Sequence, residues 1–182
     1  MAQFQKPPKY IEKILLNEET ILQRVQELGR QITQDYQNKD ILLICVLKGA
    51  LVFFADLIRD INVHFDFDFV QVSSYGNGTQ SSGNVIFLRK PVVNINDRDV
   101  LIVDDILDSG LTLSYLKSYL LSKKPSSLKI CVLLNKVSRR IIPIEVDYIG
   151  FDIPDEFVVG YGLDFNGMYR GLRYIAVLRD EN

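Results

Sequence analysis

Nearly unbroken apolar runs alternate along this chain with stretches in which apolar residues recur every three or four positions. The apolar runs are 41–47, 100–103 and 128–134, and the periodic stretches are 21–32, 51–58 and 111–121. Apolar runs of this kind are typical of strands buried on both faces of a parallel sheet, whereas the longer period is typical of helices that bury one face. The alternation predicts an α/β fold, a parallel sheet with helices on both faces.

Other segments complete this outline. Asn17, followed by two glutamates, has the features of an N-cap for the first helix. Segment 63–73 alternates between apolar and polar residues, which predicts a half-exposed strand, and segment 85–88 predicts a strand that returns beside it. A further strand is predicted at 146–151.

Length, charge and cysteine content narrow the class of protein. With 182 residues, we expect a single domain over the whole chain. A net charge of −2 argues against a nucleic-acid partner, so small ligands are favoured. The longest apolar run is too short to cross a bilayer and the first residues lack an apolar signal region, so we expect a cytoplasmic protein without a membrane partner. Cys45 and Cys131 lie inside apolar runs, which indicates buried thiols.

The most informative chemistry follows the apolar run at 100–103. Three carboxylates, Asp104, Asp105 and Asp108, come at the end of this strand, and a small polar turn then leads into a helix at Leu111. Free backbone N–H groups at a helix start, backed by the helix dipole, form an anion site. Carboxylates beside it would repel a simple phosphate but can accept hydrogen bonds from ribose hydroxyls. The pattern therefore predicts a sugar phosphate as the ligand.

This stretch, 104–112, resembles the ribose-phosphate signature of the type I phosphoribosyltransferases. The resemblance implies that Asp104 and Asp105 bind the ribose hydroxyls, and that Asp108 accepts the N7 proton of a purine. The residues implied to bind the 5-phosphate are Asp108, Ser109, Gly110, Leu111 and Thr112. An aspartate at 104 and a serine at 109 replace the glutamate and threonine often found in the family, and both changes keep the chemistry.

Two further segments resemble the 6-oxopurine phosphoribosyltransferases. The turn Leu47-Lys48-Gly49-Ala50 follows a buried strand, and the resemblance implies that Lys48 and Gly49 bind pyrophosphate and that the Leu47–Lys48 peptide is cis. Segment 73–84 holds three glycines among small polar residues, which predicts a mobile loop. In the family, the loop that begins with the counterparts of Ser74 and Tyr75 closes over the reacting centre.

The last third of the chain carries the closest match, at 150–164. By resemblance, Phe157 stacks on the purine, the Val158 backbone binds the base edge, and Lys136 donates to the oxygen at purine position 6. Asp164 is implied to lie by the amino group of guanine and to hold Mg²⁺, and Arg170 to contact pyrophosphate. An aromatic face, fixed backbone groups and a carboxylate near a cation suit a planar heterocycle.

The resemblance implies a parallel-sheet core over about 35–150 and a small hood from about 1–16 and 151–182. It also implies Mg²⁺-dependent transfer of ribose 5-phosphate from phosphoribosyl pyrophosphate to N9 of hypoxanthine or guanine, giving IMP or GMP and pyrophosphate. Members of the family are usually homodimers or homotetramers, which sets the expected assembly.

Several alternatives remain open. The acidic turn could be an ordinary solvated turn, although a turn alone does not need this full pattern. Receiver domains also place paired aspartates after a strand, but near the chain start, whereas about a hundred residues precede Asp104. The enzyme could prefer xanthine, or the chain could be a non-catalytic RNA-binding regulator of the same fold. His64, the sole histidine, shares a strand face with two carboxylates, and a surface position is favoured over a metal site.

Overall fold

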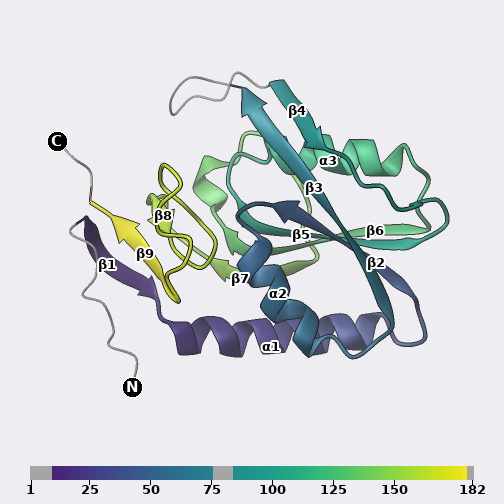
Figure 1. The fold of residues 1–182 in the computed structure, drawn as a ribbon, viewed down its shortest axis with the longest axis horizontal. Coiled ribbons are helices and arrows are strands. Elements are labelled where there is room, and N and C mark those ends of the chain that lie inside the picture. Colours follow the sequence, from purple (N-terminus) through teal and green to yellow (C-terminus); the bar gives the residue numbers. More distant parts are fainter. Residues whose placement is uncertain (1–9, 76–83, 180–182) are drawn as a thin grey trace.

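The computed structural model describes residues 10–75 and 84–179, and a six-stranded sheet forms its centre (Figure 1). The strand order is β4-β3-β2-β5-β6-β7. The strands are β2 (Ile41–Leu47), β3 (Phe65–Tyr75), β4 (Asn84–Arg89), β5 (Asp99–Leu107), β6 (Ser127–Asn135) and β7 (Tyr148–Asp152). All neighbours pair in parallel except β4, which lies antiparallel to β3 at the edge. The predicted α/β class is confirmed, with one antiparallel edge strand.

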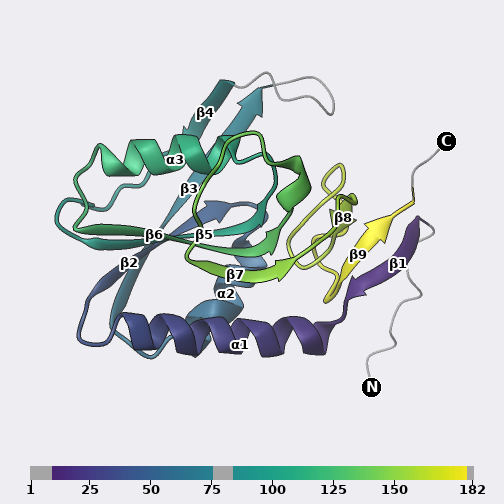
Figure 2. The ribbon, with the colours of Figure 1, turned by 180° about the vertical axis from the view of Figure 1, so that it is seen from behind.

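Three helices cover the two faces of this sheet. Helices α1 (Glu18–Asp35) and α2 (Leu51–Asp60) lie on one face and α3 (Leu111–Leu121) on the other (Figures 1 and 2). The predicted N-cap of α1 is present, because Asn17 Oδ1 accepts the backbone N–H of Thr20 at 2.8 Å. This bond satisfies one of the free N–H groups of the first turn.

The sheet separates two apolar cores, which explains the unbroken apolar run of β2. Leu43 and Cys45 belong to the core shared with α1 and α2, whereas Leu42 and Ile44 belong to the core shared with α3. Successive side chains of a strand point to opposite faces, so both sets must be apolar. Cys45 and Cys131 are both buried free thiols, as predicted.

A second, three-stranded sheet joins the two ends of the chain and forms the predicted hood. Its order is β1 (Ile11–Leu16), β9 (Ile175–Leu178) and β8 (Val158–Val159), with antiparallel pairing throughout. The turn that follows β8 packs on the main core, since a Cβ placed on Gly162 would collide with the carbonyl oxygen of Gly49. The hood therefore lies beside the carboxyl end of β2.

The structure differs from the sequence predictions around β3. The strand runs to Tyr75, so Ser73, Ser74 and Tyr75 belong to a paired strand rather than to the expected mobile loop, and Asn84 starts β4. Antiparallel pairing extends the hairpin into its small polar residues because its ladder hydrogen bonds use backbone groups alone. The rest of the expected loop, 76–83, lies outside the described residues, and its closure stays a prediction.

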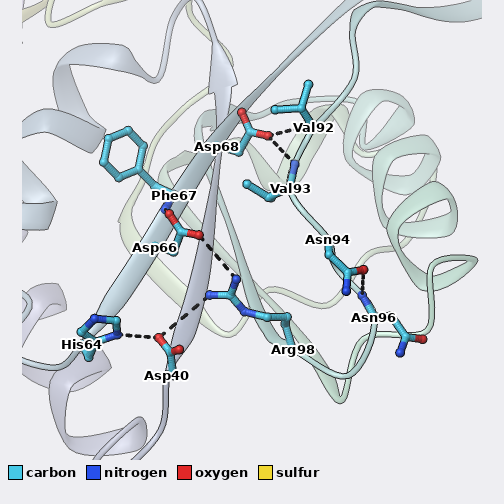
Figure 3. A network of polar contacts seen from close by, with 10 residues as sticks. All are labelled: Asp40, His64, Asp66, Phe67, Asp68, Val92, Val93, Asn94, Asn96 and Arg98. Carbon is cyan, nitrogen blue, oxygen red and sulfur yellow. Dashed lines mark hydrogen bonds and ion pairs between the residues drawn. The ribbon is translucent and has the colours of Figure 1, made fainter.

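His64 also lies differently from the prediction, just before β3 and not on its face. Its Nδ1 is 2.8 Å from Asp40 Oδ1, and Arg98 links Asp40 to Asp66 (Figure 3). Farther along β3, the buried Asp68 accepts the backbone N–H groups of the segment that follows β4. His64 is thus an exposed residue of a surface ion-pair network, as the surface alternative predicted.

None of the helices within the described ranges is both long enough and apolar enough to cross a membrane.

Candidate active site

The carboxyl ends of β2 and β5 form a pocket with a volume of about 260 Å³. It is lined by the end of β2, Val72 of β3, the continuous segment 104–110, and the first turn of α3. Ligands of open α/β sheets bind at this edge, because the strand ends and the helix N-termini meet there. The acidic strand end and the polar turn therefore share one cavity, as the sequence indicated.

The polar turn has the backbone geometry of an anion site. Gly110 has φ = 84° and forms the N-cap of α3 without a capping side chain. Within the described residues, the N–H groups of Ser109, Gly110 and Thr112 have no hydrogen-bond acceptor, and the Leu111 N–H reaches only Ser109 Oγ at 3.4 Å. Unsatisfied N–H groups at the positive end of a helix attract a phosphate.

Asp104, which is buried, and Asp105, which is half-buried, form a pair of carboxylates in the carboxyl-terminal half of β5. Burial raises the pKa of Asp104 well above its ordinary value, and repulsion from Asp105 adds to this shift. Burial also raises the pKa of Asp105, although the side-chain hydrogen bond from Asp104, backbone N–H groups and Arg170 oppose that rise. Each carboxylate accepts one backbone N–H, from Asp105 at 3.0 Å and from Ile106 at 2.9 Å, and a carboxylate has lone pairs left for the hydroxyl groups of a sugar.

The raised pKa of Asp104 predicts how the stability of the fold depends on pH. Between the ordinary and the raised pKa the folded state binds more protons than the unfolded state, so stability falls as pH rises through this window. We expect Asp104→Asn to stabilise the ligand-free protein at pH 7 by about 0.5–2 kcal/mol and to lose this advantage near pH 4. Thermal unfolding at both pH values measures the effect.

The control for this variant is Glu145→Gln, which removes one exposed carboxylate and should shift stability by less than about 0.5 kcal/mol at either pH. If Asp104→Asn were destabilising at pH 7, the Asp104 carboxylate would be satisfied in the fold and not poised for a ligand.

Asp108 lies between this pair and the anion site. Its Oδ1 atom is buried and has no hydrogen-bond partner within the described residues, and the nearest cation is Arg139, with Nε at 3.9 Å. Asp108 also lines the pocket. A buried acceptor that faces a pocket without a partner can take a proton from a bound ligand.

The turn after β2 approaches the acidic pair closely. The Leu47–Lys48 peptide is cis, as the resemblance implied. A Cβ on Gly49 would collide with the Asp105 carboxylate, so a larger residue there would displace this side chain from its observed position. Lys48 is exposed, and its two neighbours in the chain, Leu47 and Gly49, line the pocket.

Asp164 and Arg170 come together at the same edge. The Arg170 guanidinium forms an ion pair with Asp164 Oδ1 and donates to the Gly162 carbonyl at 2.7 Å, while Asp164 Oδ2 accepts the Gly167 N–H at 2.8 Å. The described residues contain no cluster of three or more metal-ligating side chains. A single carboxylate fits Mg²⁺ that takes its other ligands from substrate phosphates and water.

The residues implied to bind the base come from two places: Lys136 directly follows β6, and Phe157 and Val158 lie at the start of β8 in the hood. Lys136 is 4% exposed, and its Nζ is 3.9 Å from Asp155 Oδ1. Phe157 is 50% exposed and packs edge-to-face on Phe165, with ring centroids 5.6 Å apart, whereas Val158 is buried in β8. A half-exposed aromatic ring leaves a face free for a planar ligand.

The sequence predictions did not include the segment after Lys136. Arg140 donates from Nε to the Asp108 carbonyl at 3.2 Å and from Nη2 to Asn135 Oδ1 at 2.6 Å. The sequence does not reveal this role, because Arg139 precedes Arg140 and two adjacent cations in a loop are typical of a solvent-exposed surface. The two arginines differ only in the folded structure, where Arg140 is the one that hydrogen-bonds to the Asp108 carbonyl.

Comparisons with known proteins agree with this geometry. A family model described as phosphoribosyl transferase domain matches residues 12–166. A hypoxanthine-guanine phosphoribosyltransferase of Streptococcus thermophilus is 49% identical over 173 residues, covering 95% of this chain and 96% of the relative. That of Bacillus subtilis is 51% identical over 169 residues, covering 93% and 94%. The crystal structure of a hypoxanthine phosphoribosyltransferase from Staphylococcus aureus superposes with a TM-score of 0.89 at 46% identity, covering 93% and 92%.

Proposed function

The chain belongs to the phosphoribosyltransferase family, and we propose that it acts as a hypoxanthine-guanine phosphoribosyltransferase of purine salvage. It transfers the ribose 5-phosphate of phosphoribosyl pyrophosphate to N9 of hypoxanthine or guanine, giving IMP or GMP and pyrophosphate. The observation that carries this proposal is one pocket, lined by the acidic pair, by a helix N-terminus without a capping side chain, and by Asp108, whose Oδ1 has no partner within the described residues. The acidic pair matches the ribose hydroxyls, the helix N-terminus matches the 5-phosphate, and the Asp108 oxygen matches the N7 proton of the purine.

The sugar phosphate binds along the end of β5. The 5-phosphate accepts hydrogen bonds from the backbone of segment 108–112, and the ribose hydroxyls donate to Asp104 and Asp105. This placement holds the C1′ atom beyond the acidic pair, toward the turn at Lys48. Fixing the donor in this way supplies the orientation that the reaction needs.

The base binds under the hood. Phe157 stacks on the purine, the Val158 backbone binds its edge, and the buried Lys136 donates to the oxygen at position 6. Adenine carries an amino group at position 6, which cannot accept from an ammonium donor, so a 6-oxopurine is favoured.

Bond making and breaking follow from these positions. The bond from C1′ to pyrophosphate breaks with its electron pair on the departing oxygen, N9 forms the new bond to C1′, and Asp108 accepts the N7 proton. Lys48, Gly49 and Arg170 bind the departing pyrophosphate, whose charge the two cations balance. Asp164 would hold Mg²⁺, which supplies further charge neutralisation at the pyrophosphate when bound.

An ultraviolet assay with phosphoribosyl pyrophosphate and a single base tests the proposal. We expect turnover of guanine and hypoxanthine, little with adenine, and loss of turnover when a chelator removes Mg²⁺. Preference for xanthine would reassign the base specificity. Absence of turnover with every base, together with salt-dependent binding of RNA, would favour the non-catalytic regulator.

We further propose a homodimer or homotetramer in the cytoplasm. Leu51 of α2 and Phe67 of β3 are 47% and 44% exposed, and Phe67 packs against Phe54 of the same helix, so this apolar surface is available to a second copy. The buried free thiols of Cys45 and Cys131 are compatible with a reducing compartment. Sedimentation measures the assembly.

A further inference from the structure

The segment that follows β6 donates hydrogen bonds to the loop that carries the anion site. The Leu107 carbonyl accepts the Lys136 N–H at 2.9 Å, and the Ser109 carbonyl accepts the N–H groups of Ile141 and Ile142 at 2.9 and 3.0 Å. Between them, the Asp108 carbonyl accepts Arg140 Nε at 3.2 Å. Three consecutive carbonyl groups thus point toward the 136–142 segment.

This arrangement determines where the N–H groups point. In a trans peptide, the carbonyl of one residue and the N–H of the next lie on opposite sides. Within the described residues the only cis peptide is Leu47–Lys48, so the Ser109 and Gly110 N–H groups point away from segment 136–142. The pocket lies on that side, since residues 108–110 line it and no residue of segment 136–142 does.

Arg140 is the side chain that joins this loop to the sheet. Its second bond, from Nη2 to Asn135 Oδ1 at 2.6 Å, reaches the end of β6, and Asn135 Nδ2 donates in turn to Asp152 of β7 at 2.7 Å. A planar guanidinium with fixed donors can hold two acceptors in one geometry, which a flexible ammonium cannot. The Arg140 stem also runs under Gly110, with Cδ 3.2 Å from the site of a Cβ there.

We propose that Arg140 is a positioning residue for the 5-phosphate of the substrate. By holding the Asp108 carbonyl, it keeps the Ser109 N–H directed into the pocket and the Asp108 side chain in place, without touching the substrate itself. This inference rests on the proposed function, and it assigns a role to a residue outside the pocket lining.

Two substitutions at this position separate its donors from its packing. Arg140→Met keeps the length of the stem and removes every donor, and Arg140→Lys keeps a single donor group that cannot reach both acceptors. For Arg140→Met we expect the KM for phosphoribosyl pyrophosphate to rise by roughly tenfold to a hundredfold, with the KM for hypoxanthine changed by less than about threefold. Arg140→Lys should lie between Arg140→Met and the wild type.

Lys117→Met is the matched control. Lys117 lies on α3 and lines the same surface hollow as Arg140, so its removal takes away a cation near the loop without changing the loop's hydrogen bonds. We expect both KM values to stay within about twofold of the wild type. A rise in the KM for phosphoribosyl pyrophosphate equal to that of Arg140→Met would assign the effect to charge alone and overturn the positioning role.

A thermal shift with inorganic phosphate gives a second readout that does not need turnover. Phosphate should raise the unfolding temperature of the wild type and of Lys117→Met more than that of Arg140→Met, because a ligand that binds the folded state stabilises it. Equal phosphate shifts and equal KM values in Arg140→Met would refute the inference. Lack of turnover in the wild type with an intact phosphate effect would refute the proposed function alone.

Discussion

Asp108→Asn is expected to lower kcat by roughly 10²–10⁴-fold, the usual contribution of a positioned general base. An amide has nearly the same shape as the carboxylate but cannot accept the N7 proton. Binding of IMP or GMP should stay close to the wild-type value, because in the proposed function the backbone of segment 108–112 binds the 5-phosphate. Steady-state kinetics combined with calorimetric titration of the product nucleotide separates the two effects.

Asp97→Asn is the control for this prediction. Asp97 lies before the amino end of β5, at the opposite edge of the sheet from Asp108, and asparagine also tolerates its positive φ of 59°. This variant should keep kcat within about twofold of the wild type. Near-normal turnover in Asp108→Asn would remove Asp108 from the proton transfer and require another acceptor.

Gly110→Ala is expected to lower kcat/KM for phosphoribosyl pyrophosphate by roughly 10²-fold or more, since displacing a binding group by about 1 Å can cost this much. Gly110 has φ = 84°, where an L side chain is strained. A Cβ there would lie 2.5 Å from the Ile142 carbonyl oxygen, which is backbone and cannot move aside cheaply. The loop must therefore shift, and its N–H groups shift with it.

Gly171→Ala is the matched control, because no heavy atom of the described residues, apart from the glycine and its two chain neighbours, lies within 4 Å of its Cβ position, and its backbone is not in the strained region. We expect Gly171→Ala to retain the wild-type kcat/KM within about threefold. Circular dichroism of both variants checks that they fold. A folded Gly110→Ala protein with normal kinetics would show that the 5-phosphate binds elsewhere.

Local patterns were enough to predict the elements around the pocket. The run of 41–47, the N-cap at Asn17 and the helix at 111–121 were all predicted within a residue or two of their observed bounds, because short-range periodicity and capping determine them. The polar turn before α3 was also placed correctly, whereas the strand before it extends to Leu107 and so includes Asp104 and Asp105. Their roles came from the family resemblance, and the mutations above are needed to test them.

Longer-range features could not be predicted in the same way. Ser73–Tyr75 has a loop-like composition and yet pairs with β4, because antiparallel ladder bonds use backbone groups whatever the side chains. His64 was assigned to a strand with Asp66 and Asp68, but its partner is Asp40, which is distant in the sequence. The short strands β8 and β9 of the hood carry too few residues to show a period.

The sequence by itself determined the α/β class, the main strands and helices, and the chemistry available at the end of β5. Only the tertiary structure decided the order β4-β3-β2-β5-β6-β7, the ion pair of Asp164 with Arg170, and the support of Asp108 by Arg140. The reason is physical: periodicity and capping act over one or two turns of chain, whereas these contacts join segments whose approach depends on how whole elements pack. The direction of the N–H groups at the anion site belongs to this second kind, since the segment after β6 sets it from across the fold.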